Sequence, residues 1–122
     1  MMLLAFLLQT AAPPPMNIEP FMDEAPAARA MEAHLYCLVN SAYARRAATT
    51  EPRLIAAEAI RLCQPQAIAF REALADVYRR KPQLLPAGQQ ADEAAATYVN
   101  EMNGRIEAVI RIDREHRNAQ NR

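Results

Sequence analysis

Glycine and tryptophan are the residues that this chain most clearly lacks, since its 122 residues include 2 glycines and no tryptophan. Alternation of apolar and polar residues, the pattern of a half-buried strand, is absent as well. Alanine is abundant, and it loses less conformational entropy in a helix than any other residue, whereas glycine loses the most. These features argue against a β-sheet protein and predict an all-α fold, and the length limits it to a single domain.

Long apolar runs are also missing, apart from a short one at the start of the sequence. Residues 1–12, "MMLLAFLLQTAA", are an apolar stretch that ends in small residues, which is typical of a secretory signal, although no lysine or arginine precedes it. The run is shorter than the ~20 residues that span a bilayer, so only this segment is expected to contact a membrane. We expect a periplasmic or secreted protein, whereas a true start at Met16 or Met22 would give a cytoplasmic one.

The sequence motifs of common enzyme classes are absent. There is no glycine-rich phosphate loop, no nucleophile elbow, no HExxH and no CxxC pair. Carboxylates lie on the expected solvent faces, except for Asp113, which we interpret as the end of an apolar stripe rather than as a general base. We therefore expect no enzymatic activity, no catalytic residue, no metal and no cofactor.

Neither sign of charge is in excess, because 14 lysines and arginines balance 14 aspartates and glutamates. A neutral chain has no overall attraction to nucleic acid or to an anionic membrane. The charges are nevertheless uneven: residues 19–32 carry 4 acids against 1 arginine, a net of −3, and residues 45–81 carry 8 bases against 4 acids, a net of +4. We expect the basic middle of the chain to face its acidic flanks within the fold.

The densest basic cluster is "YRRKP", residues 78–82. Cations in the last turn of a helix stabilise that end, and a following proline stops the helix, so a structural role is our main interpretation. The alternative is a patch for an anionic ligand or for nucleic acid, which the zero net charge and the lack of interleaved aromatics disfavour. The candidate residues of that patch are Arg45, Arg46, Arg79, Arg80 and Lys81.

The sequence does contain three stretches of helical periodicity. A proline-rich linker is expected over residues 13–22, a single helical domain over 23–118 and a frayed tail over 119–122. The helices are expected at about 23–47, 51–81 and 91–117, and the middle one is expected to be a single helix kinked at Pro65. The first two helices would form an antiparallel hairpin and the long third would lie across them, which gives a three-helix bundle.

Each expected helix has an apolar face. The first helix has a stripe of larger residues that includes Leu35 and Leu38, and beside it a stripe of small residues that includes Cys37. The middle helix has the clearest division, with Phe70 on the apolar face and Arg71 on the polar one. The apolar stripe of the third helix consists of Ala95, Tyr98, Val99, Met102, Ile106, Val109 and Ile110.

The chain has two cysteines, Cys37 and Cys63, and they are equidistant from Thr50 in the turn expected between the first two helices. Residues equidistant from the turn of an antiparallel hairpin lie opposite each other, here about 20 Å along either arm at 1.5 Å per residue. Cys37 lies on the stripe of small residues, which permits close approach, and Cys63 lies at the centre of the apolar face. The register therefore predicts a structural disulfide, worth about 3.5 kcal/mol by loop entropy.

Three other roles for the cysteines remain open at this stage. They are a redox-regulated dithiol, two buried reduced thiols in a cytosolic protein, and a zinc site completed by His34 and His116. The zinc site lacks the second close pair of ligands that short-spaced zinc motifs contain.

The layout of a short leader, few helices and one disulfide is similar to that of small periplasmic stress chaperones and secreted inhibitors, although no motif matches either group. We therefore expect a small exported, non-catalytic helical protein that acts through contacts with other proteins or with envelope components, in a chaperone-like or inhibitor-like way. The alternative is a cytosolic helical regulator that binds protein or nucleic acid and whose thiols are reduced or redox-switchable.

Overall fold

The structure is a computed structural model, and it describes residue 21, residues 23–45 and residues 49–121. These residues form helices and connecting turns and contain no strand, which confirms the all-α prediction. The predicted leader and nearly all of the predicted linker lie outside the described residues. The described elements are α2 (Ala25–Tyr43), α3 (Pro52–Leu62), α4 (Gln64–Arg80), the short 3-10 helix η2 (Pro82–Leu84) and α5 (Ala91–Gln120).

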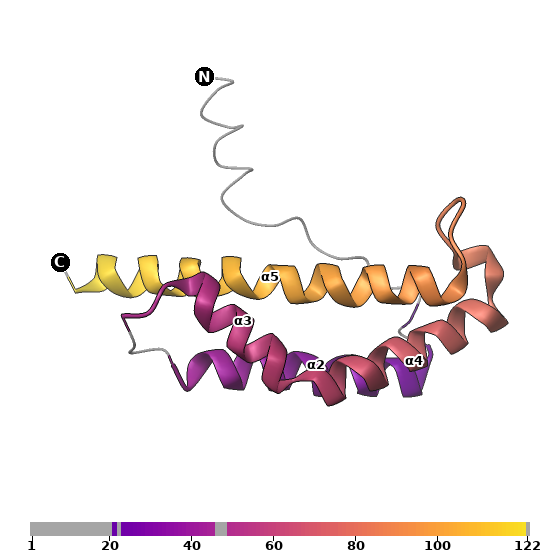
Figure 1. Ribbon diagram of the computed structural model, residues 1–122, viewed down its shortest axis with the longest axis horizontal. Coiled ribbons are helices and arrows are strands. Elements are labelled where there is room, and N and C mark those ends of the chain that lie inside the picture. The colour runs from indigo at the N-terminus through magenta and orange to yellow at the C-terminus, as the bar shows by residue number, and fades with distance from the viewer. Residues whose placement is uncertain (1–20, 22, 46–48, 122) are drawn as a thin grey trace, which may run out of the picture.

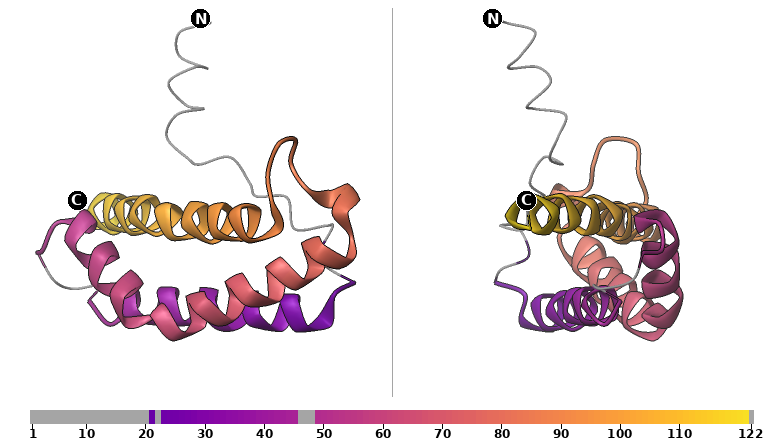
Figure 2. Two further views of the ribbon diagram at one scale, coloured as in Figure 1. Left: turned by 45° about the vertical axis from the view of Figure 1, so that its right-hand side comes forward. Right: turned by 90° about the vertical axis from the view of Figure 1, so that its left-hand side faces the viewer.

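Helix α5 lies along one side of the other helices and runs most of the length of the described structure (Figure 1). Helices α2 and α5 begin at the same end of the molecule and run in the same general direction. Helices α3 and α4 form two arms that meet close to the middle of α2, and their outer ends reach opposite ends of α5 (Figure 2). Viewed end-on, α3 lies to one side of α2 and α5.

The prediction of a single middle helix kinked at Pro65 is wrong, because the chain forms two helices that are separated at Cys63. Cys63 has φ −99° and ψ 18°, and it is both the last cap of α3 and the first cap of α4. Pro65 lies in the first turn of α4, where its missing N–H does no harm. Within a continuous helix its ring would clash with the carbonyl of Arg61, four residues earlier, so the chain breaks instead of kinking.

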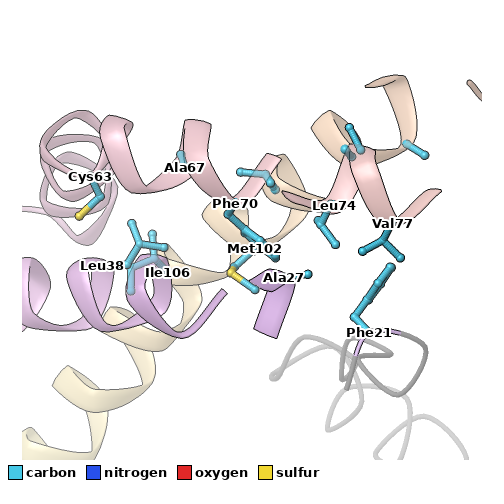
Figure 3. Packing of buried hydrophobic residues seen from close by; sticks show 14 of the residues in the cluster. Phe21, Ala27, Leu38, Cys63, Ala67, Phe70, Leu74, Val77, Met102 and Ile106 are labelled. Atoms are coloured by element: carbon cyan, nitrogen blue, oxygen red, sulfur yellow. The ribbon is translucent and has the colours of Figure 1, made fainter. Parts of the chain in front are cut away.

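The expected apolar face of the middle segment is nevertheless confirmed on both sides of this break. Phe70, Leu74 and Val77 are fully buried between α2 and α5 (Figure 3), whereas Arg71 is exposed. Five residues of α5 are buried: Ala95, Val99, Met102 and Ile106 belong to the expected stripe, and Ala94 lies beside it. Ala56 and Ala59 of α3 are buried as well. The spacing of apolar residues therefore predicts the core face of both α3 and α4, although the helix is interrupted at Cys63.

The expected stripe of larger residues on α2 is confirmed at Leu38, which is buried, but not at Leu35. Leu35, expected on the apolar stripe, is 46% exposed, whereas His34, beside it, is 0% exposed. Ala27, His34 and Leu38 are the buried residues of this helix, and they lie along the boundary between the two expected stripes. The core thus contacts α2 between the stripe of large residues and the stripe of small ones.

Cys37 and Cys63 form the predicted disulfide, with their Cα atoms 5.9 Å apart. Cys37 lies in the middle part of α2, and Cys63 is the residue between the two arms α3 and α4. Cys63 is fully buried. The bond therefore attaches the bend in the chain covalently to the middle part of α2.

We predict that Phe70→Ala lowers the free energy of unfolding by about 3–5 kcal/mol, because it removes a large side chain from the core. Arg71→Ala is the matched control on the solvent side of the same helix and should change it by about 0.5 kcal/mol or less. Urea unfolding of the two variants measures both values. Equal losses would show that the core face of α4 has been placed incorrectly.

We also predict that replacing both Cys37 and Cys63 with alanine lowers the free energy of unfolding by about 2–5 kcal/mol. The closed loop, with a sequence separation of 26, no longer restricts the unfolded chain, while the buried helix faces remain. Denaturant titration with circular dichroism tests this prediction. Helical content at low temperature should be retained, and an unchanged midpoint would contradict a stabilising role for the bond.

Candidate functional site

An apolar groove lies between the C-terminal halves of α2 and α5, with a volume of about 170 Å³. Its floor is formed by Ile55 of α3 and Ile106 of α5, both of which are buried. Its walls are half-exposed: Val39 and Tyr43 come from α2, and Val109 comes from α5. We call this feature the α2/α5 groove.

The walls of the α2/α5 groove include residues whose helical spacing predicted burial. Val109 belongs to the expected apolar stripe of α5 but is 50% exposed. Val39, which was not part of an expected stripe, is 45% exposed. Isolated exposed apolar residues are common on protein surfaces, but here they share one groove with a buried apolar floor. The apolar surface of α2 and α5 therefore extends beyond the part that the core buries.

One end of the α2/α5 groove is positively charged. Arg45, Arg114 and Arg117 border it, and Asp113 is the acid among its lining residues. Arg117 Nε lies 3.2 Å from Asp113 Oδ2. Arg45 lies near Glu58 of α3, whose pKa is lowered mainly by Arg61 and in part by Arg45. The lining thus carries three positive charges against one negative charge, a net of +2.

The other end of the same side of the molecule is filled by Phe21. This residue is 6% exposed, and its ring packs edge-on against Tyr78 of α4 and Tyr98 of α5, with ring centres 5.5 and 5.4 Å away. Tyr98 and Val109 lie on the same side of α5, about three turns apart. An aromatic side chain that precedes α2 therefore covers the start of this side, and the groove lies further along it.

The basic cluster of residues 79–81 is engaged in ion pairs with acids of the same fold. Arg80 forms two hydrogen bonds with the carboxylate of Glu24, at 2.9 and 3.3 Å, and Lys81 Nζ lies 2.9 Å from Glu24 Oε1. Arg79 donates a 2.8 Å hydrogen bond to Asp92. These contacts attach the start of α2 and of α5 to the end of α4, as the uneven charge distribution predicted.

The structure does not bring together all of the candidate anion-binding residues. Arg79, Arg80 and Lys81 lie at the end of α4, whereas Arg45 follows the C-terminus of α2 and borders the α2/α5 groove at the other end of the molecule. Arg46 lies outside the described residues. The cluster at residues 79–81 faces Glu24, whose pKa these contacts, above all the hydrogen bonds from Arg80, lower from 4.5 to about 2.

The four ligands of the conceivable zinc site are separated in the structure. Cys37 and Cys63 are bonded to each other, and His116 is paired with Gln120 near the end of α5. His34 lies in the core, where its Nε2 donates a 2.7 Å hydrogen bond to Asn103 Oδ1. Among the residues that the structure describes, no group of three histidine, cysteine or acidic side chains could hold a metal ion.

A helix can span a membrane only if it is long and apolar enough. Among the described helices, α2 to α5, none combines the length and the apolar character needed to cross a membrane.

Sequence reasoning identified the disulfide but not the groove or the His34–Asn103 pair. The sequence did carry a signal for the groove. The apolar stripe of α5 continues through Val109 and Ile110, beyond the last buried residue, Ile106. The signal for the pair was weak, because a histidine and an asparagine 69 residues apart reveal nothing of their proximity before the helices are placed.

We predict that acidification destabilises the protein through His34. Burial lowers the pKa of His34 below its usual value of 6.5, and the hydrogen bond that His34 donates to Asn103 opposes that shift only in part. Nδ1 is buried and has no hydrogen-bond partner in the described structure, so the imidazolium would have an unpaired buried donor. Below pH 6.5 the unfolded chain therefore binds a proton that the folded chain does not, and stability falls as the pH falls.

The expected loss is at most about 1.4 kcal/mol per pH unit for one such group, starting near pH 6.5 and ending at the pKa of the folded state. His34→Gln keeps a donor for Asn103 and removes the titration. Urea unfolding between pH 7 and pH 5 should show a smaller pH dependence for His34→Gln than for the natural chain. Identical slopes would assign the pH dependence to other groups.

The chain was also compared with known proteins. No protein-family model matches it, no curated protein is similar to it, and no solved structure resembles it. Similarity therefore contributes nothing to a functional assignment, which has to rest on the groove, the disulfide and the placement of charge.

Proposed function

We propose that this protein is a small exported, non-catalytic helical protein that acts by contact with other proteins, in a chaperone-like or inhibitor-like way. The observation that carries the proposal is the α2/α5 groove, where apolar residues expected to be buried line an open surface. Apolar surface that is gathered in one place and bordered by polar groups is typical of protein interaction sites.

The disulfide supports the exported part of the proposal. Disulfides persist in oxidising compartments such as the periplasm or the extracellular space and are rare in the cytosol. The Cys37–Cys63 bond is typical of such a compartment. The signal-like composition of residues 1–12 supports the same location independently.

A structural role for the bond also agrees with a function in binding. The bond holds the bend between α3 and α4 on α2, and α3 supplies Ile55 to the floor of the groove. A groove with a rigid frame loses less conformational entropy on binding than a flexible one. The proposal therefore assigns the disulfide the role of a scaffold rather than of a switch.

Photo-crosslinking in the cell that naturally makes the protein tests the proposal. A photoreactive phenylalanine analogue replaces Val109 in the groove or, as the control, Leu62 at the end of α3, because the two residues are 50% and 51% exposed. We expect a protein adduct from position 109 and none from position 62. The recovered chain should begin at Ala12 or Pro13 and should contain a linked Cys37–Cys63 peptide.

Two results would contradict this proposal. A chain that begins at Met1, Met16 or Met22 and has two alkylatable thiols would instead favour the cytosolic regulator. Absence of any protein adduct from position 109 would contradict action through this groove, whatever the location of the protein.

A further inference from the structure

The size of the α2/α5 groove limits what it can bind. Sites for small organic ligands usually have volumes of about 300–1,000 Å³, whereas a cavity of about 150 Å³ is filled by a single benzene ring. At about 170 Å³ the groove suits one aromatic or large aliphatic side chain. A ligand that anchors through such a side chain and continues along the surface fits better than a compact metabolite.

The chain itself provides an example of such an anchor. Phe21 precedes α2 and is buried against Tyr78 and Tyr98 on the same side of α5 as the groove. Tyr98 lies about 16 Å from Val109 along the axis of α5, at 1.5 Å per residue. An aromatic side chain from a separate segment is therefore already accommodated on this side of the molecule, about three turns before the groove.

The helix arrangement indicates the form of the segment that would carry the anchor. Helices α2 and α5 run in the same general direction on either side of the groove, and α3 closes its floor (Figures 1 and 2). An added helix between α2 and α5 would be the fourth helix at the groove, beside α2, α3 and α5. Its residues at positions i, i+3, i+4 and i+7 would face the apolar walls. Exposed apolar residues along both walls, Val39, Tyr43 and Val109, provide the contact length.

The charge of the groove selects among amphipathic helices. Its lining has three arginines against one aspartate, and the arginines lie together at the end where α2 and α5 finish. A helix with carboxylates beside its apolar face would place them opposite these arginines, whereas a helix with lysines would be repelled. Charge complementarity at a rim sets specificity more than total affinity.

We infer that the α2/α5 groove binds an acidic amphipathic helix of a partner protein, with an aromatic or large aliphatic residue inserted over Ile55 and Ile106. The inference rests on the proposed function and adds the chemical character of the partner. Arg45, at the rim, contacts a carboxylate of the bound helix, and the half-exposed walls formed by Val39 and Val109 become buried.

Two synthetic helical peptides test the inference with the full, disulfide-bonded chain. Both have about 15 residues, the length at which isolated helices begin to be stable, with Phe and Leu on one face, and they differ only in having Glu or Lys at the flanking positions. Fluorescence anisotropy measures affinity, and amide chemical shifts locate the site. We expect the Glu peptide to bind at least about tenfold more tightly, with shifts concentrated in residues 39–45 and 106–117.

Variants of the chain separate the groove from the rest of the surface. Val109→Glu should reduce binding of the Glu peptide at least about tenfold, because it puts a carboxylate in the apolar wall. Leu62→Glu is the control with equal exposure outside the groove and should bind as the natural chain does. Arg45→Glu should lower the preference for the Glu peptide over the Lys peptide, and circular dichroism of each variant verifies that it is folded.

Several outcomes would overturn the inference. Equal affinity for the two peptides would refute the acidic character of the partner. The proposed contact function would stand in that case if the photo-adduct at position 109 still forms. Shifts outside the groove, or binding unchanged by Val109→Glu, would place the peptide elsewhere. Binding of neither peptide, with a concentration-dependent mass in ultracentrifugation, would make a second copy of the chain the occupant.

Discussion

Cys63 is the residue at which the chain leaves one helix and enters the next, and its sulfur is bonded to Cys37 in α2. The bend between α3 and α4 is therefore fixed against the centre of α2, while the outer ends of both arms reach α5. The arms hold α5 from one side. Helices α2 and α5 consequently meet each other less extensively than either meets the arms, and the groove lies between their C-terminal halves.

Local sequence patterns predicted the features that depend on one helix or on a simple register. The apolar face around Phe70 and Leu74, and the pairing of two cysteines equidistant from a turn, both follow from helix geometry. The break at Cys63 was harder to predict, because a proline in an exposed position is compatible with a kink or with two helices. The choice depends on whether the arms gain more contacts by diverging, which is a property of the whole fold.

The exposure of Leu35 on α2 has a similar cause. Helical spacing placed Leu35 in the core, but the buried boundary between the stripes contains His34, whose polar ring is accepted because Asn103 of α5 provides its hydrogen-bond partner. A buried polar group is tolerated when such a partner exists, and the partner is visible only in three dimensions. The same limit explains the charges: the unevenness along the chain predicted ion pairs, yet only the fold shows that Arg80 meets Glu24 and that Arg45 lies at the groove.

The disulfide also explains how so small a domain can leave an apolar groove open. A chain of this size gains limited stability from burial alone, and surface left exposed between α2 and α5 contributes none of it. A disulfide stabilises mainly by restricting the unfolded chain, and so it adds stability without burying more apolar surface. The Cys37–Cys63 bond lies at the bend, and neither cysteine lines the groove, so the bond supports the frame of the groove without covering it. The two cysteines thus stabilise the fold, and other residues, such as Val39 and Val109, form the exposed surface of the groove.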